Sequence, residues 1–218
     1  MHYANGFPLL WPLLFRTCLE PWCARSAGCR YTSCGWDLSA GTAGPNPVTA
    51  MSKLATLEAL LVQEIKDLYD AEGQLVKALP KMAKAATDSS VREALLKHCE
   101  ETKGHVERLE EIAKFIDASP RGKTCKAMRG LVEEGSEVIE EEGDPAIKDF
   151  ALIIAAQKIE HYEIAGYGSV RTLAKALRLD DVVELLQSTL DEEGASDKSL
   201  TELALNITPA AMDAGMRV

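Results

Sequence analysis

Apolar residues recur alternately three and four positions apart through most of residues 54–206, and this spacing constrains the fold more than any other feature of the chain. It places the apolar side chains on one face of an α-helix, so each helix must bury that face against other helices. The pattern therefore predicts an all-α protein built as a helix bundle. The clearest series is Val183, Leu186, Leu190, Glu193, Asp197, Leu200 and Ala204.

Capping and breaking residues divide this region into four long helices and one short helix. The box Ser90-x-x-Glu93 predicts the start of the second helix, and Asp144 followed by Pro145 predicts the start of the fourth. Two long helical hairpins are then joined by a crossover that contains the short helix, which is the connectivity of ferritin-like four-helix bundles. The predicted helices span about 53–86, 90–117, 123–141, 145–177 and 181–207, the last ending before Thr208-Pro209.

The composition of the chain changes abruptly at Met51. Residues 1–50 are rich in Pro, Gly, Cys and Trp without a helical or strand period, whereas Leu, Ala, Glu and Lys dominate afterwards. We predict a bundle domain over 51–206, a flexible tail over 207–218, and a disordered or mis-assigned extension over 1–50, with Met51 as the working start. An alternative is that the apolar residues 7–15 belong to a secretion signal, although proline interrupts them and no basic segment precedes them.

The charge of the chain limits its partners. The formal net charge is −10, which disfavours binding to nucleic acid or to an anionic membrane. No apolar run reaches the roughly 18 to 20 residues that a membrane-spanning helix needs. Cys99 and Cys125, the two cysteines of the bundle region, fit a reducing compartment. We therefore expect a soluble cytoplasmic protein that binds neither nucleic acid nor membrane.

Acidic residues interrupt the apolar face of the long helices near the middle of each helix. An unpaired carboxylate in an apolar core costs several kcal/mol, and no lysine or arginine lies near these acids on the same face. Divalent metal is the natural counter-charge, and oxygen ligands with one or two imidazoles suit two ions of iron or manganese. The candidate metal ligands are Glu64, Glu101, His105, Glu160, Glu193 and Asp197.

Other polar residues near these faces have simpler interpretations. Glu72 and Glu163 lie at the edges of the apolar faces, where a solvated carboxylate is common. His98 and His161 are interpreted as hydrogen-bonded histidines at the edge of the core rather than as ligands. The hydroxyl of Thr102 is expected to bond back to its own helix.

Four stretches of the chain, over residues 63–72, 100–109, 155–168 and 190–198, resemble the YciE/YciF family of bacterial ferritin-like stress proteins. The string Gln-x-x-Glu-His-Tyr-Glu over 157–163 is the most specific of these features. The resemblance covers nearly all of 51–206 and none of 1–50. It implies a ferritin-like fold, a homodimer, a bacterial cytoplasmic setting and a link to osmotic or general stress, and it implies no known reaction.

The predicted ligands depart from the usual di-iron pattern in one respect. Di-iron ferritin-like proteins carry Glu-x-x-His on two helices. Here Glu101 precedes His105 by four residues, and Glu193 is followed by Asp197 rather than by a histidine. Such a set is rich in oxygen and poor in nitrogen. It is therefore also consistent with a calcium or magnesium site, or with a metal-free site whose acids share protons.

Two functions are consistent with these residues. In the first, the protein holds a dinuclear iron or manganese centre and acts as an oxidoreductase that disposes of peroxide or oxidises ferrous iron. In the second, it is a non-enzymatic stress protein whose bundle serves as a dimerisation or binding module and whose acids form a metal-free polar network.

Overall fold

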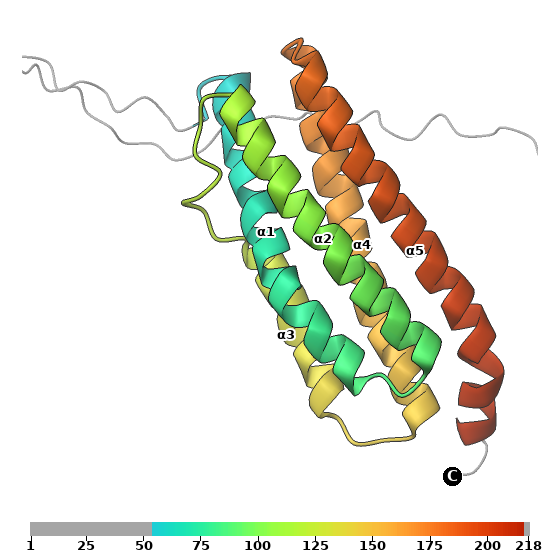
Figure 1. Cartoon of the computed structure of the whole chain (residues 1–218). Coiled ribbons are helices and arrows are strands. Elements are labelled where there is room, and N and C mark those ends of the chain that lie inside the picture. Colours follow the sequence, from blue (N-terminus) through green and yellow to red (C-terminus); the bar gives the residue numbers. More distant parts are fainter. Residues whose placement is uncertain (1–53, 216–218) are drawn as a thin grey trace, which may run out of the picture. The chain divides into compact units, whose positions relative to one another are not determined.

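The computed structural model describes residues 54–215 as a bundle of α-helices (Figure 1). The predictions for residues 1–50 and for the last three residues of the chain lie outside the described residues. Between 54 and 215 no helix is both long enough and apolar enough to cross a membrane. The helices are α1 (Leu57–Ala85), α2 (Ser89–Phe115), α3 (Lys126–Glu140), α4 (Pro145–Ala176) and α5 (Asp180–Gly215).

The predicted all-α, ferritin-like four-helix fold is confirmed. The four long helices lie side by side, α1 with α2 and α4 with α5 as antiparallel hairpins (Figure 1). The short helix α3 lies in the crossover between the hairpins and packs against α1 and α4. Each predicted helix is present, and the bounds differ by a few residues at most except at the end of α5.

Side chains at the helix ends explain most of these bounds. Asp144 caps α4 by accepting a hydrogen bond from the Ala146 amide at 2.9 Å, with Pro145 in the first turn, as predicted. The predicted cap of α2 at Ser90 is wrong. Asp88 is the cap, because its carboxylate accepts from the amides of Ser90 at 2.8 Å and Val91 at 3.2 Å.

The predicted end of the last helix before Thr208-Pro209 is also wrong. Helix α5 continues through Pro209 to Gly215, so most of the stretch expected to be a flexible tail is helical. The proline removes one backbone donor. Burial of Ile207 in the apolar core favours continuation of the helix and offsets the loss of this donor. The Thr208 hydroxyl also donates to the Ala204 carbonyl at 2.7 Å.

A second proline lies inside α1. Pro80 has no amide hydrogen, so the carbonyl of Val76, four residues earlier, lacks its usual helical donor. The buried Cys99 thiol on α2 donates to that carbonyl over 3.9 Å. This contact helps to fix the register of α2 against α1.

The crossover is held to the bundle by side chains just before α3. The amide of Cys125, the cap of α3, donates to Asp70 on α1 at 2.8 Å. On α4, the Tyr162 hydroxyl donates to Asp67 at 2.6 Å and lies 2.9 Å from the Cys125 sulfur. These contacts join α1, α3 and α4 at one place.

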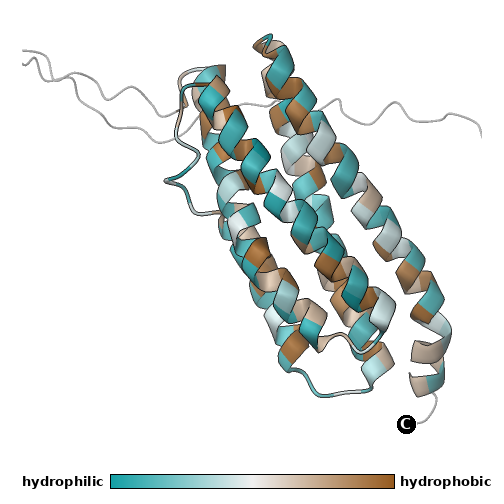
Figure 2. Ribbon diagram, viewed as in Figure 1, coloured by the Kyte–Doolittle hydropathy of each residue, from teal (hydrophilic) through white to brown (hydrophobic). Residues whose placement is uncertain are grey.

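Apolar side chains form two separate cores inside the bundle. Hydrophobic and hydrophilic residues are interspersed along every helix (Figure 2). One core contains Leu75, Leu79, Leu95, Ile153 and Leu200 among its members. The other core contains Leu61, Leu68, Leu109, Val170 and Leu186 among its members.

We expect Asp149→Ala to destabilise the protein strongly. Asp149 on α4 is 2% exposed and accepts from the Thr87 amide at 2.8 Å, the Thr87 hydroxyl at 2.5 Å and the Asp88 amide at 2.7 Å. Hydrogen bonds to a charged acceptor contribute roughly 1.5–3 kcal/mol each, so the free energy of unfolding in urea should fall by about 3 kcal/mol or more. Asp144→Ala, which removes an exposed helix cap, is the control and should cost only about 1 kcal/mol. Equal losses for the two variants would contradict the anchoring role of Asp149.

Candidate metal centre

Six buried polar side chains meet in the layer between the two apolar cores, which we call the polar layer. Helix α1 contributes one of them, α2 two, α4 two and α5 one. None is more than 4% exposed. The members of the polar layer are Glu72, His98, His105, Glu160, Glu163 and Glu193.

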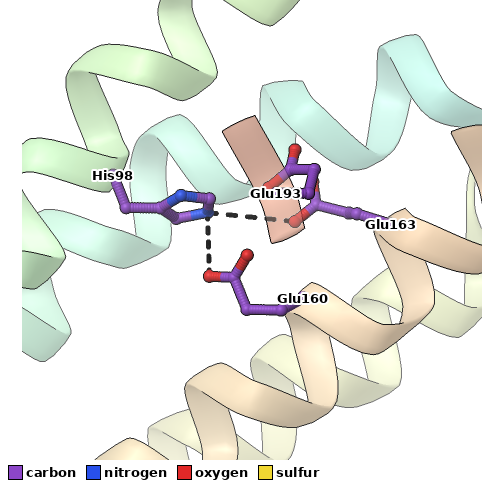
Figure 3. Close-up of side chains that lie close together, drawn as sticks. All are labelled: His98, Glu160, Glu163 and Glu193. Atoms are coloured by element: carbon purple, nitrogen blue, oxygen red, sulfur yellow. Dashed lines mark ion pairs between the residues drawn. The ribbon is translucent and has the colours of Figure 1, made fainter. Parts of the chain in front are cut away.

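The first group in this layer joins α2, α4 and α5 (Figure 3). The Nε2 atom of His98 lies 3.3 Å from an oxygen of Glu160 and 3.9 Å from an oxygen of Glu163. Glu193 completes the group, and one potential ligand atom from each of the four residues lies within 4.8 Å of the others. That spacing allows one metal ion to contact all four side chains.

The second group joins α1, α2 and α5. The Nδ1 atom of His105 lies 3.0 Å from an oxygen of Glu193 and 3.5 Å from an oxygen of Glu72. The ligand atoms of these three residues also lie within 4.8 Å of one another. Glu193 belongs to both groups, so its carboxylate lies between two possible ion positions.

The inner atoms of the polar layer lack hydrogen-bond partners. Buried polar atoms in native proteins are nearly always paired, so each exception needs a reason. Of the nine buried side-chain nitrogen and oxygen atoms without a partner in residues 54–215, eight belong to this layer. They are Glu72 Oε2, His98 Nε2, His105 Nδ1, Glu160 Oε2, both carboxylate oxygens of Glu163 and both of Glu193.

Ser196 on α5 orients the ring of His98. Its hydroxyl donates to Glu160 at 3.0 Å and lies 3.3 Å from His98 Nδ1. Because the single hydroxyl proton goes to Glu160, Nδ1 must be the donor in the contact with His98. The lone pair of the neutral imidazole is then on Nε2, which faces the carboxylates of Glu160 and Glu163. A lone pair directed at two acids needs a proton or a metal ion from that side.

His105 is oriented in the same way from the other side of the layer. Its Nε2 lies 2.9 Å from an oxygen of Glu192, which Arg108 also holds through two hydrogen bonds of 3.0 and 3.2 Å. Metal-bound histidines usually donate their outer N–H to such a carboxylate, which fixes the ring and its tautomer. Both histidines therefore have an outer nitrogen that contacts a hydrogen-bonding side chain and an inner nitrogen that faces acids.

Burial and neighbouring charge shift the pKa values of the layer in different directions. Burial, reinforced by the charge of Glu193, raises the pKa of Glu160, and burial together with the charges of Glu72 and Glu193 raises that of Glu163 well above its usual range. Burial lowers the pKa of His98 to about 4, which keeps its imidazole neutral at neutral pH. Although burial also opposes the charge on His105, its contacts with Glu193 and Glu72 raise its pKa to about 10.

Comparison with known proteins identifies the family. The domain family described as "Domain of unknown function (DUF892)" matches residues 56–213. Protein YciF of Escherichia coli strain K12 is 42% identical over 154 residues, which cover 70% of this chain and 93% of that protein. The chain belongs to the YciE/YciF family.

Two solved structures share the fold. The crystal structure of the E. coli stress protein YciF aligns with a TM-score of 0.70 and 41% identity, over 72% of this chain and 99% of that one. YcfI from Rhodopseudomonas palustris aligns with a TM-score of 0.65 and 40% identity, over 67% of this chain and 93% of that one. Nearly the whole length of each relative is therefore represented in this bundle.

The structure of this YciF-like chain brings together three of the six predicted ligands. His105, Glu160 and Glu193 lie in the polar layer. The placement of Glu64 on the buried face was wrong, because its side chain is 40% exposed and lies 3.6 Å from the Lys123 ammonium. Glu101 is 26% exposed and pairs with Lys97 on its own helix.

Asp197 lies beside the polar layer rather than in it. Its side chain is 25% exposed, accepts a hydrogen bond from Gln157 at 3.2 Å and lies 3.3 Å from the largely exposed His161. The carboxylate therefore faces the outer side of the contact between α4 and α5. In both groups described above, Glu193 is the acid that α5 supplies.

Sequence reasoning assigned three polar-layer residues to less buried positions. Glu72 and Glu163 were expected at solvated edges, but both are at most 1% exposed. His98 was expected at the edge of the core, and it lies within the first group. The series Leu61, Ile65, Leu68, Glu72 and Leu75, spaced four and three apart, was the available signal for Glu72. The expected bond from the Thr102 hydroxyl to its own helix is confirmed, with the His98 carbonyl as acceptor at 2.7 Å.

We expect the metal-free protein to lose stability as the pH rises from about 7 to about 9. The pKa values of Glu160, Glu163 and His105 are raised in the folded state, so each binds its proton more tightly there than in the unfolded chain. This contribution is fully present below the unfolded pKa and is lost as the pH approaches the folded value. Urea unfolding of chelator-treated protein at a series of pH values measures this change in the free energy of unfolding.

The Glu160→Gln variant tests the origin of that slope. Glutamine resembles the protonated acid and does not titrate, so the fall in stability with pH should be shallower. Glu100→Gln, at a side chain that is 73% exposed, is the matched control and should keep the original slope. A stability that rises between these pH values in chelator-treated protein would contradict the assigned protonation states.

Proposed function

We propose that this chain is a stress-response protein with a dinuclear iron or manganese centre in the polar layer. One observation carries the proposal: eight buried ligand atoms from four helices face one another without hydrogen-bond partners. Buried carboxylates without compensating charge are strongly unfavourable, and bound cations remove that cost. The proposed ligands are Glu72, His98, His105, Glu160, Glu163 and Glu193.

The chemistry of the donors supports two ions of a transition metal. Four carboxylates and two imidazoles are also the total that di-iron ferritin-like bundles use, although those proteins arrange them as Glu-x-x-His. Two divalent cations balance four carboxylate charges, whereas one leaves two charges buried. Imidazole nitrogen suits iron, whereas calcium and magnesium prefer oxygen alone.

The position of Glu193 supports a shared site. Its carboxylate lies within reach of both groups, and both of its oxygens lack hydrogen-bond partners. Glu193 would therefore be held in common by both ions. Ser196 and Glu192 keep the inner nitrogens of the two histidines directed at this acid and its neighbours.

The surroundings of the polar layer suit redox chemistry with a small oxidant. When bound, iron or manganese supplies the electron transfer that turnover of peroxide or oxidation of ferrous iron requires. The apolar cores on both sides exclude bulk water. The fully buried hydroxyl of Tyr167 donates to Glu72, which holds that carboxylate in place. We therefore propose peroxide or ferrous iron as the substrate.

The remaining parts of the proposal rest on the family. The E. coli relative YciF is described as a stress protein, and we propose a stress role for this chain on that basis. We also propose a homodimer in the bacterial cytoplasm, which the resemblance to the YciE/YciF family implies. The competing function is a non-enzymatic binding module in which the acids of the polar layer share protons, and metal content separates the two functions.

We expect protein purified without chelator, after supplementation with iron or manganese, to contain two metal ions per chain. Elemental analysis by mass spectrometry measures the content, and exposure to peroxide tests turnover. The metal should also raise the melting temperature, because it binds the folded state alone. Less than one ion per two chains after supplementation would exclude the metal centre and favour the proton-sharing module.

We expect substitutions in the polar layer to remove ions according to group. Glu193→Gln should abolish tight binding of both ions, because Glu193 belongs to both groups. Glu160→Gln should weaken the first ion, and Glu72→Gln the second. Glu64→Gln, which changes the same charge at an exposed side chain, is the matched control and should keep both ions. Loss of both ions in Glu64→Gln, with retention in Glu193→Gln, would overturn the assignment of ligands.

A further inference from the structure

A small cavity adjoins the first group of the polar layer, between α2 and α5. Its volume is about 20 Å³, which is enough for one water molecule. Four larger cavities at the surface of residues 54–215 are lined by none of the six polar-layer residues. The small cavity is lined by Ala94, Leu95, Lys97, His98, Glu101, Glu160, Ser196, Ser199 and Leu200.

The lining of this cavity runs from buried ligand atoms to solvent. At the inner end, His98 is 4% exposed and Glu160 is 1% exposed, and each has an atom without a hydrogen-bond partner. At the outer end, the side chain of Lys97 is 69% exposed and that of its ion-pair partner Glu101 is 26% exposed. One cavity therefore touches both the first group and the surface.

Two of the residues that line the cavity have small side chains. Ala94 on α2 and Ser199 on α5 occupy positions where larger residues would fill the space. Ser196 presents a hydroxyl inside the cavity, where it already contacts both His98 and Glu160. A partly dehydrated cation thus has oxygen atoms along its path from Glu101 to Glu160.

We propose that this cavity is the port through which divalent transition-metal ions reach the centre, and that Glu101 is the first carboxylate to bind the entering ion. The inference rests on the proposed function and adds the route of uptake. Before the ion arrives, Lys97 neutralises Glu101. The entering cation displaces the lysine ammonium, binds Glu101, and then passes the Ser196 hydroxyl to reach His98 and Glu160. Glu101 is a transit residue and not a ligand of the final centre.

The test is the rate at which metal-free protein takes up Co²⁺, followed by stopped-flow absorption under anaerobic conditions. Glu101→Gln should slow the uptake roughly three- to ten-fold, because the port loses its charge, while the final stoichiometry and spectrum stay unchanged. Glu100→Gln is the matched control: the neighbouring acid has the same charge, is 73% exposed and does not line the cavity. Its uptake rate should equal that of the unmodified protein.

A second variant tests the space rather than the charge. Ala94→Leu should fill the cavity and slow uptake without changing the amount of Co²⁺ bound. Ala151→Leu makes the same change at a cavity that does not touch the centre, and should leave the rate unchanged. Circular dichroism checks that each variant is folded.

The outcomes separate this inference from the proposed function. If the unmodified protein binds no Co²⁺, the metal centre itself is refuted. If it binds Co²⁺ and Glu101→Gln matches Glu100→Gln in rate, the port is refuted and the centre stands. A lower final stoichiometry in Glu101→Gln would also overturn the inference, because Glu101 would then be a ligand.

Discussion

The rest of the structure depends on carboxylates and imidazoles that are buried at one level of a helix bundle. Each long helix interrupts its apolar face there, and the apolar residues divide into one core on either side. Four acids in a dry interior repel one another unless protons or cations lie among them. The repulsion among these acids is therefore relieved by bound protons or cations, and the two apolar cores hold the acids in place.

The hydrogen bonding of this layer is directional. The outer atoms of the histidines contact Ser196 and Glu192, and one oxygen of Glu72 accepts from Tyr167. The inner nitrogens of the histidines and the second oxygen of Glu72 have no hydrogen-bond partner in the protein. If the layer served only as a structural polar network, its members would be expected to satisfy one another. A layer in which the outer polar atoms are hydrogen-bonded and the inner ones lack hydrogen-bond partners is the arrangement expected around a bound ion.

The fold could be predicted from the sequence because the apolar spacing, the breaks and the crossover length all indicate the same connectivity. The site could be predicted only in part. On α1 the alternation of three and four can begin from Leu61 in either phase: one phase reaches Glu64, and the other reaches Ile65 and then Glu72. Contacts with α2, such as Tyr69 with Glu110 and Val76 with Cys99, decide the phase. A single helix cannot supply that information.

The distribution of donors explains why motif spacing alone was misleading. The usual Glu-x-x-His pair mixes an acid and a histidine on one helix. Here α2 carries both histidines, two turns apart, and α4 carries Glu160 and Glu163, one turn apart. Packed antiparallel helices bring residues from different turns to the same level. The total of four acids and two histidines is therefore the same, although both histidines are on one helix and two of the acids are on another. Whether several ligand atoms can contact one metal ion depends on the level and direction of each atom in the bundle. These depend on how the helices pack rather than on the residue spacing within any one helix.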